Sequence, residues 1–344
     1  MNPVASRART DARRILLPRV FRRLRESLRE SGTMEMWTKT RRPALALAAL
    51  VAAGCARGDA RQTAGAAADT KAPEAACEVM EKGVSLPEDL RESSGIAASR
   101  AHPGIYWSHN DSGRRPELFA VDLNGQLRGQ MPVTGALNND WEDIALGPCP
   151  QGGGDCLYLS DTGNNGRERK HVALWVFPEP APGAAATAPA TEYTARFPGE
   201  ATDIEAIAVL PDGRVLLVSK GNKDAVQLIR WPTPLRPGQE PTLEPLRVLA
   251  PEPTELGDRV TGASASPDGR FVAVRTYAAL AIYRTQDLLG TGRPIAQMDL
   301  DPLAETQGEA VSLSNDGSVV LTSEGPGSKH LPGTLAHLRC ALPG

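Results

Sequence analysis

The sequence predicts an all-β fold, a five-bladed β-propeller, because one short phrase recurs five times along it. Each copy starts with polar or acidic residues, continues as a small apolar strand and ends in a turn. The copies are ESSGIAAS (92–99), DWEDIALGP (140–148), DIEAIAVLPDG (203–213), VTGASASPDG (260–269) and QGEAVSLSNDG (307–317). Repeats of about 40–50 residues built only of strands and turns are typical of propellers, with one repeat for each blade.

One position of this phrase carries a polar residue in every copy. Aligned on the turn, the five copies place these residues there, at intervals of 48 to 63 residues: Ser94, Glu142, Glu205, Thr261 and Glu309. Blades are arranged around an axis, so a position reused in each blade brings its side chains to one level of the central channel.

The number of strand-like runs predicts how the ring closes. The first four repeats each divide into four short runs with turn signals between them, which is the pattern of a blade. The fifth repeat supplies only three, at 309–314, 318–324 and 334–340. We expect residues 77–86 to supply the missing outer strand, because pairing the first strand with the last leaves no open edge.

A six-bladed ring is the alternative, if the long segment 181–200 contains further strands. Residues 181–190, APGAAATAPA, have the composition of a flexible surface loop between the third and fourth strands of the second blade.

The five cysteines fit an exported protein. Cys149 and Cys156 flank a predicted hairpin tip, PQGGGD, while Cys77 and Cys340 lie at the two ends of the predicted propeller. Four cysteines allow three pairings. The strand assignment favours the disulfides Cys77–Cys340 and Cys149–Cys156, which leaves Cys55 for another role.

The N-terminal residues predict a lipoprotein signal peptide over 34–54, a flexible tether over 55–76 and the propeller over 77–344. The apolar run from Ala44 to Ala53 is too short to span a bilayer. The Ala-Ala-Gly-Cys sequence that follows it resembles the lipobox of bacterial lipoproteins, which implies acylation of Cys55 and an extracytoplasmic location in the cell envelope. An ordinary secretory signal is the alternative. Residues 1–33 are interpreted as a start codon placed too far upstream, or as a cytoplasmic extension.

The charge of the chain is unevenly distributed. The net charge is −3, but residues 1–54 hold 12 Lys/Arg and 4 Asp/Glu, so the remainder holds 26 basic and 37 acidic residues, a net of −11. Such an acidic domain has no electrostatic footprint for nucleic acid and is repelled by anionic lipid. We therefore expect a monomer that meets the membrane only through its lipid. Its expected partners are a small cation and a small-molecule or protein ligand.

Candidate site residues gather at one rim, because the innermost strand of a blade begins where its second strand ends. Several carboxylates meeting there would repel one another unless a hard cation neutralises them, and Asp, Glu and Asn oxygens are the ligands that Ca²⁺ prefers. The predicted metal ligands are Glu142, Asp161, Glu205 and Glu309. The predicted ligand-binding residues are Asp111, Asp140, Asp203, Lys220, Arg275 and Glu324. If the protein is an enzyme, the candidate catalytic residues are His109 and Glu142.

A structural reading of the same acids is also open. Asp and Glu at strand starts can accept N–H bonds from a neighbouring blade and lock the ring instead of binding a ligand.

These phrases carry a resemblance to known proteins. DWEDIALGP, the following LYLSDTGNNGRERKHVALWVFPEP and the upstream ESSGIAAS and WSHNDSG resemble motifs of a group of uncharacterised exported bacterial propeller proteins. The chain more loosely resembles calcium-dependent phytase-like and gluconolactonase-like propellers, which implies a cation site at Glu142, Asp161, Glu205 and Glu309. It lacks the dense Lys/Arg cluster of a phytase, which argues against phosphate-ester hydrolysis.

The sequence therefore predicts a lipid-anchored propeller with an acidic, Ca²⁺-binding mouth that acts as a binding or scaffold module. A metal-dependent hydrolase of small esters, lactones or phosphates is the alternative. A third possibility is a mainly structural lipoprotein that uses the rim as a platform for a partner.

Overall fold

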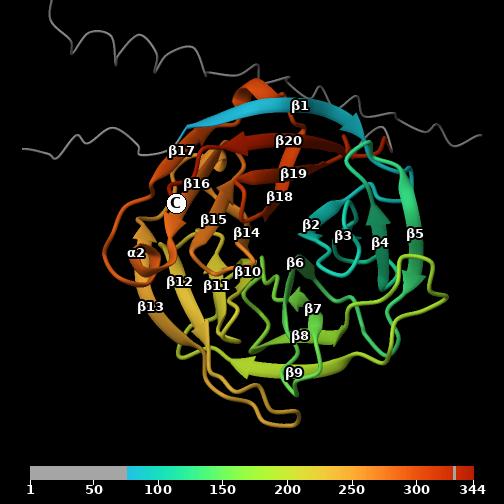
Figure 1. Ribbon diagram of the computed structural model, residues 1–344. Coiled ribbons are helices and arrows are strands. Elements are labelled where there is room, and N and C mark those ends of the chain that lie inside the picture. Colours follow the sequence, from blue (N-terminus) through green and yellow to red (C-terminus); the bar gives the residue numbers. More distant parts are fainter. Residues whose placement is uncertain (1–75, 328–330) are drawn as a thin grey trace, which may run out of the picture. The chain divides into compact units, whose positions relative to one another are not determined.

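The computed structural model describes residues 76–327 and 331–344. Cys55, the signal peptide and nearly all of the tether predicted above lie outside these residues. Figure 1 shows five sheets around a central axis, with β2, β6, β10, β14 and β18 nearest the centre. The described residues therefore form a five-bladed β-propeller, which confirms the predicted fold.

Each of the first four blades is a four-stranded antiparallel sheet whose strands follow one another in chain order. Blade 1 contains β2 (Ser93–Ala98), β3 (Tyr106–Asn110), β4 (Glu117–Val121) and β5 (Leu127–Pro132). Blade 2 contains β6 (Trp141–Pro148), β7 (Asp155–Asp161), β8 (His171–Pro178) and β9 (Thr191–Arg196). Blade 3 contains β10 (Ile204–Val209), β11 (Val215–Ser219), β12 (Val226–Trp231) and β13 (Glu244–Ala250). Blade 4 contains β14 (Val260–Ala265), β15 (Phe271–Thr276), β16 (Ala279–Arg284) and β17 (Ala296–Asp299).

Blade 5 closes the ring with the first strand of the propeller. Its sheet has the order β1–β20–β19–β18, formed by β1 (Cys77–Ser85), β18 (Gln307–Leu313), β19 (Ser318–Glu324) and β20 (Thr334–Cys340). Cys77 lies opposite Cys340 in the β1–β20 ladder, and the two form a disulfide, as do Cys149 and Cys156. The predicted closure and both predicted pairings are confirmed.

Short helical turns are the other regular elements of the described residues. They are α2 (Thr285–Leu289) and the 3₁₀ turns η2 (Leu256–Asp258) and η3 (Asp301–Leu303). Among the described helices, none has the length and apolar character needed to cross a membrane.

The six-bladed alternative is wrong, because segment 181–200 adds no sheet of its own. Residues 191–196 form β9, the outer strand of blade 2, and 181–190 contain no strand. The loop is also tied to blade 1. Buried Thr187 accepts a hydrogen bond from the Thr134 backbone N–H at 3.0 Å, and its own carbonyl accepts one from the Thr134 hydroxyl at 2.9 Å.

The core lies between the blades. The buried apolar side chains form five clusters in the described residues, and each cluster draws on two neighbouring blades. Within β6, Ile144 belongs to the cluster shared with blade 1, while Ala145 belongs to the cluster shared with blade 3. Both faces of the strand are therefore buried, as expected of a sheet packed between two others.

Each innermost strand contains a β-bulge near its start. The pairing of inner and second strands shifts by one residue within each blade, and the extra residue is the one that the sequence repeat made equivalent. The five extra residues are Ser94, Glu142, Glu205, Thr261 and Glu309. A bulge redirects a side chain away from the regular alternation of the strand. The repeated position is thus the place where each blade can turn a polar group out of the core.

Candidate functional site: a carboxylate-lined mouth

The bulge residues play two different structural roles. In blades 1 and 4 they are hydroxyl residues that donate to the backbone of the next blade: Ser94 to the Glu142 carbonyl at 2.6 Å, and Thr261 to the Glu309 carbonyl at 2.8 Å. In blades 2, 3 and 5 they are glutamates that are 6%, 2% and 4% exposed. The two hydroxyls join neighbouring blades. Of the five bulge residues, the three glutamates are therefore the candidates for binding a ligand.

Two of these glutamates belong to compact carboxylate groups. Oxygens of Glu142, Asp203 and Glu205 all lie within 4.8 Å of one another, and so do oxygens of Asp111, Asp140 and Glu142. Glu142 is common to both groups. The mouth, as used below, means these five carboxylates together with Lys220.

The first group has oxygens that the protein leaves without a donor. Asp203 Oδ1 accepts the Asn164 backbone N–H at 2.6 Å, but Oδ2 is buried with no partner. Glu205 Oε2 pairs with Lys220 Nζ at 2.8 Å, whereas Oε1 is buried with no partner. Buried oxygens in this state are costly unless a ligand satisfies them.

The electrostatics of the mouth follow from its burial. Loss of solvent raises the pKa of Glu142 well above its usual range, and the neighbouring Glu205 carboxylate raises it further. Burial likewise raises the pKa of Glu205 to about 8, although Lys220 lowers it. Asp111 lies closer to solvent, and its pKa is raised to about 6, mainly by burial. Without added positive charge, burial therefore favours the protonated state of Glu142 and Glu205.

Glycine at position 163 allows the backbone to approach these carboxylates. A Cβ added there would lie 2.0 Å from Glu142 Oε1 and 2.4 Å from Asp140 Oδ2. The Gly163 N–H also donates to the Asp140 carbonyl at 3.2 Å. The DTG turn that follows β7 thus forms one wall of the mouth, and a larger residue would collide with the carboxylates.

Glu309 and Glu324 form a separate acidic pair on the same rim. Burial raises the pKa of Glu309 well above its usual range, and Glu324 adds to the effect. The pKa of Glu324 is raised to about 7, again chiefly by burial. Glu309 accepts a hydrogen bond from the Gln307 amide at 2.7 Å. This pair lies outside both of the compact groups defined above.

Three predicted site residues are engaged in structural contacts. Asp161, fully buried, pairs with Arg169 at 2.8 Å and accepts from the Asn139 amide at 3.0 Å. Arg275 is also fully buried, and its Nη1 donates to two carbonyls of blade 5, at 2.8 and 3.0 Å. His109 is enclosed between blades 1 and 2, its ring nearly perpendicular to that of Trp141 at a centroid distance of 5.7 Å.

The surroundings of His109 favour a neutral ring. Burial lowers its pKa to about 4, and Nδ1 lies 3.1 Å from the Asn110 carbonyl. A Cβ added to Gly95 would lie 2.7 Å from His109 Nε2, which shows how closely blade 1 surrounds the ring. In this structure His109 therefore contributes packing between the blades.

Two residues near the mouth were not singled out for a site by the sequence. Asp143 is fully buried, and its Oδ2 accepts the N–H groups of Ile207 at 3.0 Å and Ala263 at 3.1 Å. Its carboxylate joins the inner strand of blade 2 to those of blades 3 and 4. The two N–H groups belong to residues that follow the bulges of blades 3 and 4 by two positions. Tyr277 lies beside the mouth, where burial and Glu309 raise its pKa. Asp143 could have been recognised in the sequence as an acidic residue next to the repeated position. Nothing in the repeat indicated a place for Tyr277 at the mouth.

The arrangement can hold a hard cation. Two groups of three carboxylates, the first with two unsatisfied oxygens, match the donor chemistry of Ca²⁺, which binds oxygen ligands and accepts irregular geometry. Lys220 supplies a single positive charge to a group of five acids. An added divalent cation would supply the charge and the contacts that the buried oxygens lack.

Fold and site together define a β-propeller with a carboxylate-lined mouth. No protein-family model and no curated protein sequence matches the chain. Among solved structures, it is similar to the PQQ-bound aldose sugar dehydrogenase of Streptomyces coelicolor at 11% identity and a TM-score of 0.47, covering 78% of this chain and 99% of that one.

Two other solved structures show similar levels of likeness. Virginiamycin B lyase of Staphylococcus aureus gives 11% identity and a TM-score of 0.35, over 72% of this chain and 67% of that one. A streptogramin B lyase gives 11% identity and a TM-score of 0.39, over 77% of this chain and 98% of that one. These likenesses carry no argument about chemistry, and the propeller assignment depends on the strand pairing of the chain itself.

Proposed function

We propose that this propeller binds Ca²⁺ at its mouth and acts as a binding or scaffold module in the cell envelope. The observation that carries the proposal is the group formed by Glu142, Asp203 and Glu205. Each of the three offers an oxygen within 4.8 Å of the others, and Asp203 and Glu205 each have a buried oxygen without a donor. Glu142, Asp203 and Glu205 would hold the cation, with Asp111 and Asp140 beside it.

The proposal also concerns location. A lipid on Cys55 would anchor the protein to a membrane, with the propeller outside the cytoplasm. The two disulfides support this, because such bonds persist mainly in oxidising compartments. The net charge of −11 over residues 55–344, derived above, favours a cation over nucleic acid as partner. We propose that the protein is a monomer. We also propose that it belongs to the group of exported propeller proteins whose motifs its DWEDIA and DTGNN phrases resemble.

A metal-dependent hydrolase is the second candidate, and one observation favours it. Asp111 is partly exposed, belongs to the carboxylate group of Glu142 and has a pKa raised to about 6. As an ionised carboxylate beside the cation, Asp111 could accept a proton from an attacking water. Because His109 is enclosed between blades, the base in this proposal is Asp111.

The test is calorimetric titration of the full-length protein with Ca²⁺. We expect binding with a dissociation constant of about 0.1–1 mM, the range of extracellular calcium modules. Glu142→Gln and Glu205→Gln should each abolish it. Glu192→Gln, an exposed glutamate on β9, is the matched control and should bind like the wild type. Absence of heat at millimolar Ca²⁺, or unchanged binding in both mouth variants, would refute the proposal.

The two candidates are separated by turnover. A panel of chromogenic esters, lactones and phosphates should give no hydrolysis if the protein is a binding module. Hydrolysis that chelation removes and that Asp111→Asn abolishes would establish the hydrolase. Calcium binding without turnover would exclude it for the compounds tested.

A further inference from the structure

A cavity of about 350 Å³ lies between blades 2 and 3, apart from the carboxylates of the mouth. Its wall comes from the β7–β8 loop, the β9–β10 loop, the β11–β12 loop and strands β12 and β13. The volume falls within the range of small-molecule sites.

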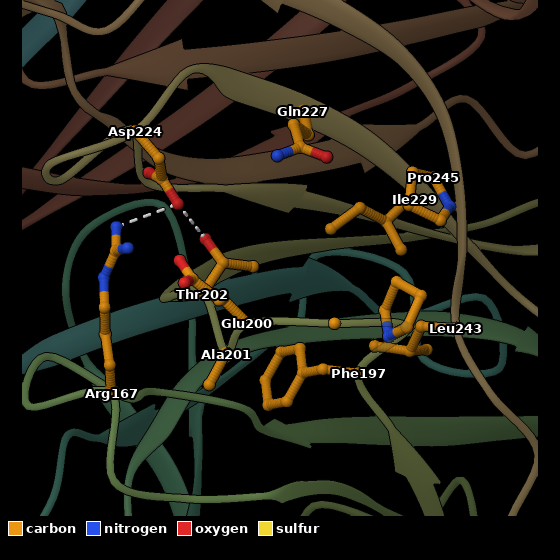
Figure 2. Close-up of a pocket in the computed structure, with 12 residues that line it drawn as sticks. Arg167, Phe197, Glu200, Ala201, Thr202, Asp224, Gln227, Ile229, Leu243 and Pro245 are labelled. Atoms are coloured by element: carbon orange, nitrogen blue, oxygen red, sulfur yellow. Dashed lines mark hydrogen bonds and ion pairs between the residues drawn. The ribbon is translucent and has the colours of Figure 1, made fainter.

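The two ends of the cavity differ in chemistry. Figure 2 shows Phe197, Ile229, Leu243 and Pro245 on one side, with Arg167, Asp224 and Thr202 on the other. Small-molecule sites commonly combine an apolar body with a few fixed polar groups in this way.

The polar end is held by an ion pair. Asp224 Oδ2 accepts from the Thr202 hydroxyl at 2.6 Å and lies 2.9 Å from Arg167 Nη2, which also donates to the Asn222 carbonyl at 2.6 Å. Asp224 Oδ1 is buried without a partner. The side-chain amide of Gln227, drawn at the upper edge of the cavity in Figure 2, makes no hydrogen bond within the described residues. This end therefore retains both donor and acceptor capacity.

Both loops that carry the ion pair contain a strained residue. Arg167 has φ +58° and Lys223, next to Asp224, has φ +70°; among described non-glycine residues only Ala304 shares this property. The left-handed conformation is unfavourable for residues other than glycine. The Asn164 side chain holds the first loop by bonding both the N–H and the carbonyl of Arg169. Strain of this kind concentrates at sites where a side chain must be placed for a ligand.

The charges indicate which ligand fits. Arg167 is already neutralised by Asp224, and Glu200 at the cavity wall adds a negative charge, so a carboxylate would be repelled. A neutral group that both donates and accepts matches the Gln227 amide, the remaining Arg167 N–H groups and the Asp224 carboxylate. We infer that this cavity is a second binding site, specific for a small neutral amide carried on an aromatic or branched apolar group. The site is independent of the cation at the mouth.

Three probes of nearly equal size test the inference: benzamide, benzoate and benzylamine. In saturation-transfer NMR with the full-length protein, benzamide should bind with a dissociation constant of about 1–10 mM. Ala201→Trp should fill the cavity and abolish the signal, while Ala186→Trp, on the exposed 181–190 loop, should leave it unchanged. Gln227→Leu should weaken binding about two- to tenfold, as the loss of one hydrogen bond requires.

Each other outcome overturns the inference. Equal benzamide signals in the wild type and Ala201→Trp would show that the molecule binds elsewhere, and no signal from the wild type would show that the cavity takes no amide. Stronger binding of benzoate or benzylamine would refute the neutral ligand class. Should Ala201→Trp fail to fold, the Gln227→Leu titration decides alone. Benzamide binding should persist in Glu142→Gln, so failure of this inference and failure of the cation proposal are distinguishable.

Discussion

Replacing Glu142 by glutamine is expected to stabilise the metal-free protein and to remove its response to Ca²⁺. Two ionised oxygens within 4.8 Å of each other repel by about 3 kcal/mol or more at an effective dielectric constant of about 20. Lys220 and partial protonation offset some of this, so we expect a gain of about 1–3 kcal/mol at pH 8. For a domain of this size each kcal/mol moves the melting temperature by about 2–4 °C.

The pH dependence has a definite sign. The folded-state pKa values of Asp111, Glu324 and Glu205 are raised to about 6, 7 and 8. Their contribution to stability is complete below their unfolded pKa values, near 4, and is lost as pH rises through the folded values. The metal-free wild type should therefore lose stability between about pH 4 and pH 8, and Glu142→Gln should lose less.

Thermal unfolding followed by circular dichroism measures both effects. At a Ca²⁺ concentration 100 times the dissociation constant, binding stabilises the wild type by about 2.7 kcal/mol, or roughly 5–10 °C. The shift should be smaller at pH 5, where Ca²⁺ must displace protons, and absent in Glu142→Gln. The reasoning is refuted if Glu142→Gln keeps the wild-type Ca²⁺ shift, or if wild-type stability rises from pH 5 to pH 8 without metal.

Four further changes have defined outcomes. Asp143→Ala should destabilise the fold by about 3–5 kcal/mol in urea titrations, because it leaves three buried N–H groups without an acceptor; a loss below 1 kcal/mol would contradict its locking role. Glu309→Gln should retain calorimetric Ca²⁺ binding, since Glu309 lies outside both compact groups. Loss of binding would show instead that Glu309 belongs to the cation site. Removing the disulfide with Cys77→Ser and Cys340→Ser should cost about 2–5 kcal/mol, measured in the same way; an unchanged midpoint would contradict this. Palmitate labelling should mark the wild type and spare Cys55→Ala, and equal labelling would exclude the anchor.

Much of the fold could be predicted because the blades of a propeller repeat the same pattern of strands and turns along the chain. The recurring turn and the missing fourth strand of the last repeat gave the number of blades and the closure by residues 77–86. The repeated polar position could also be found, although its cause, a bulge in every inner strand, is visible only in the strand pairing.

The assignment of individual side chains was less predictable. Asp143 and Glu142 are adjacent acids in one phrase, yet Asp143 bonds two other blades while Glu142 faces the carboxylate groups. The bulge decides between them, and it depends on the register with β7. Arg275 lies near the end of the second strand of blade 4, and Lys220 directly follows the second strand of blade 3. The guanidinium of Arg275, however, donates to carbonyls of blade 5. Such partners come from other blades, so no local pattern contains them.

The junction between the first and last strands has a consequence for the chain as a whole. The Ala341 N–H donates to the Ala76 carbonyl at 2.9 Å, next to the disulfide of Cys77 and Cys340. The two ends of the propeller therefore meet, and the ring has no intrinsic first blade. A circular permutant in which Ala76 follows Ala341 through a short linker, opened at the exposed turn 211–213, would keep every sheet and the same mouth.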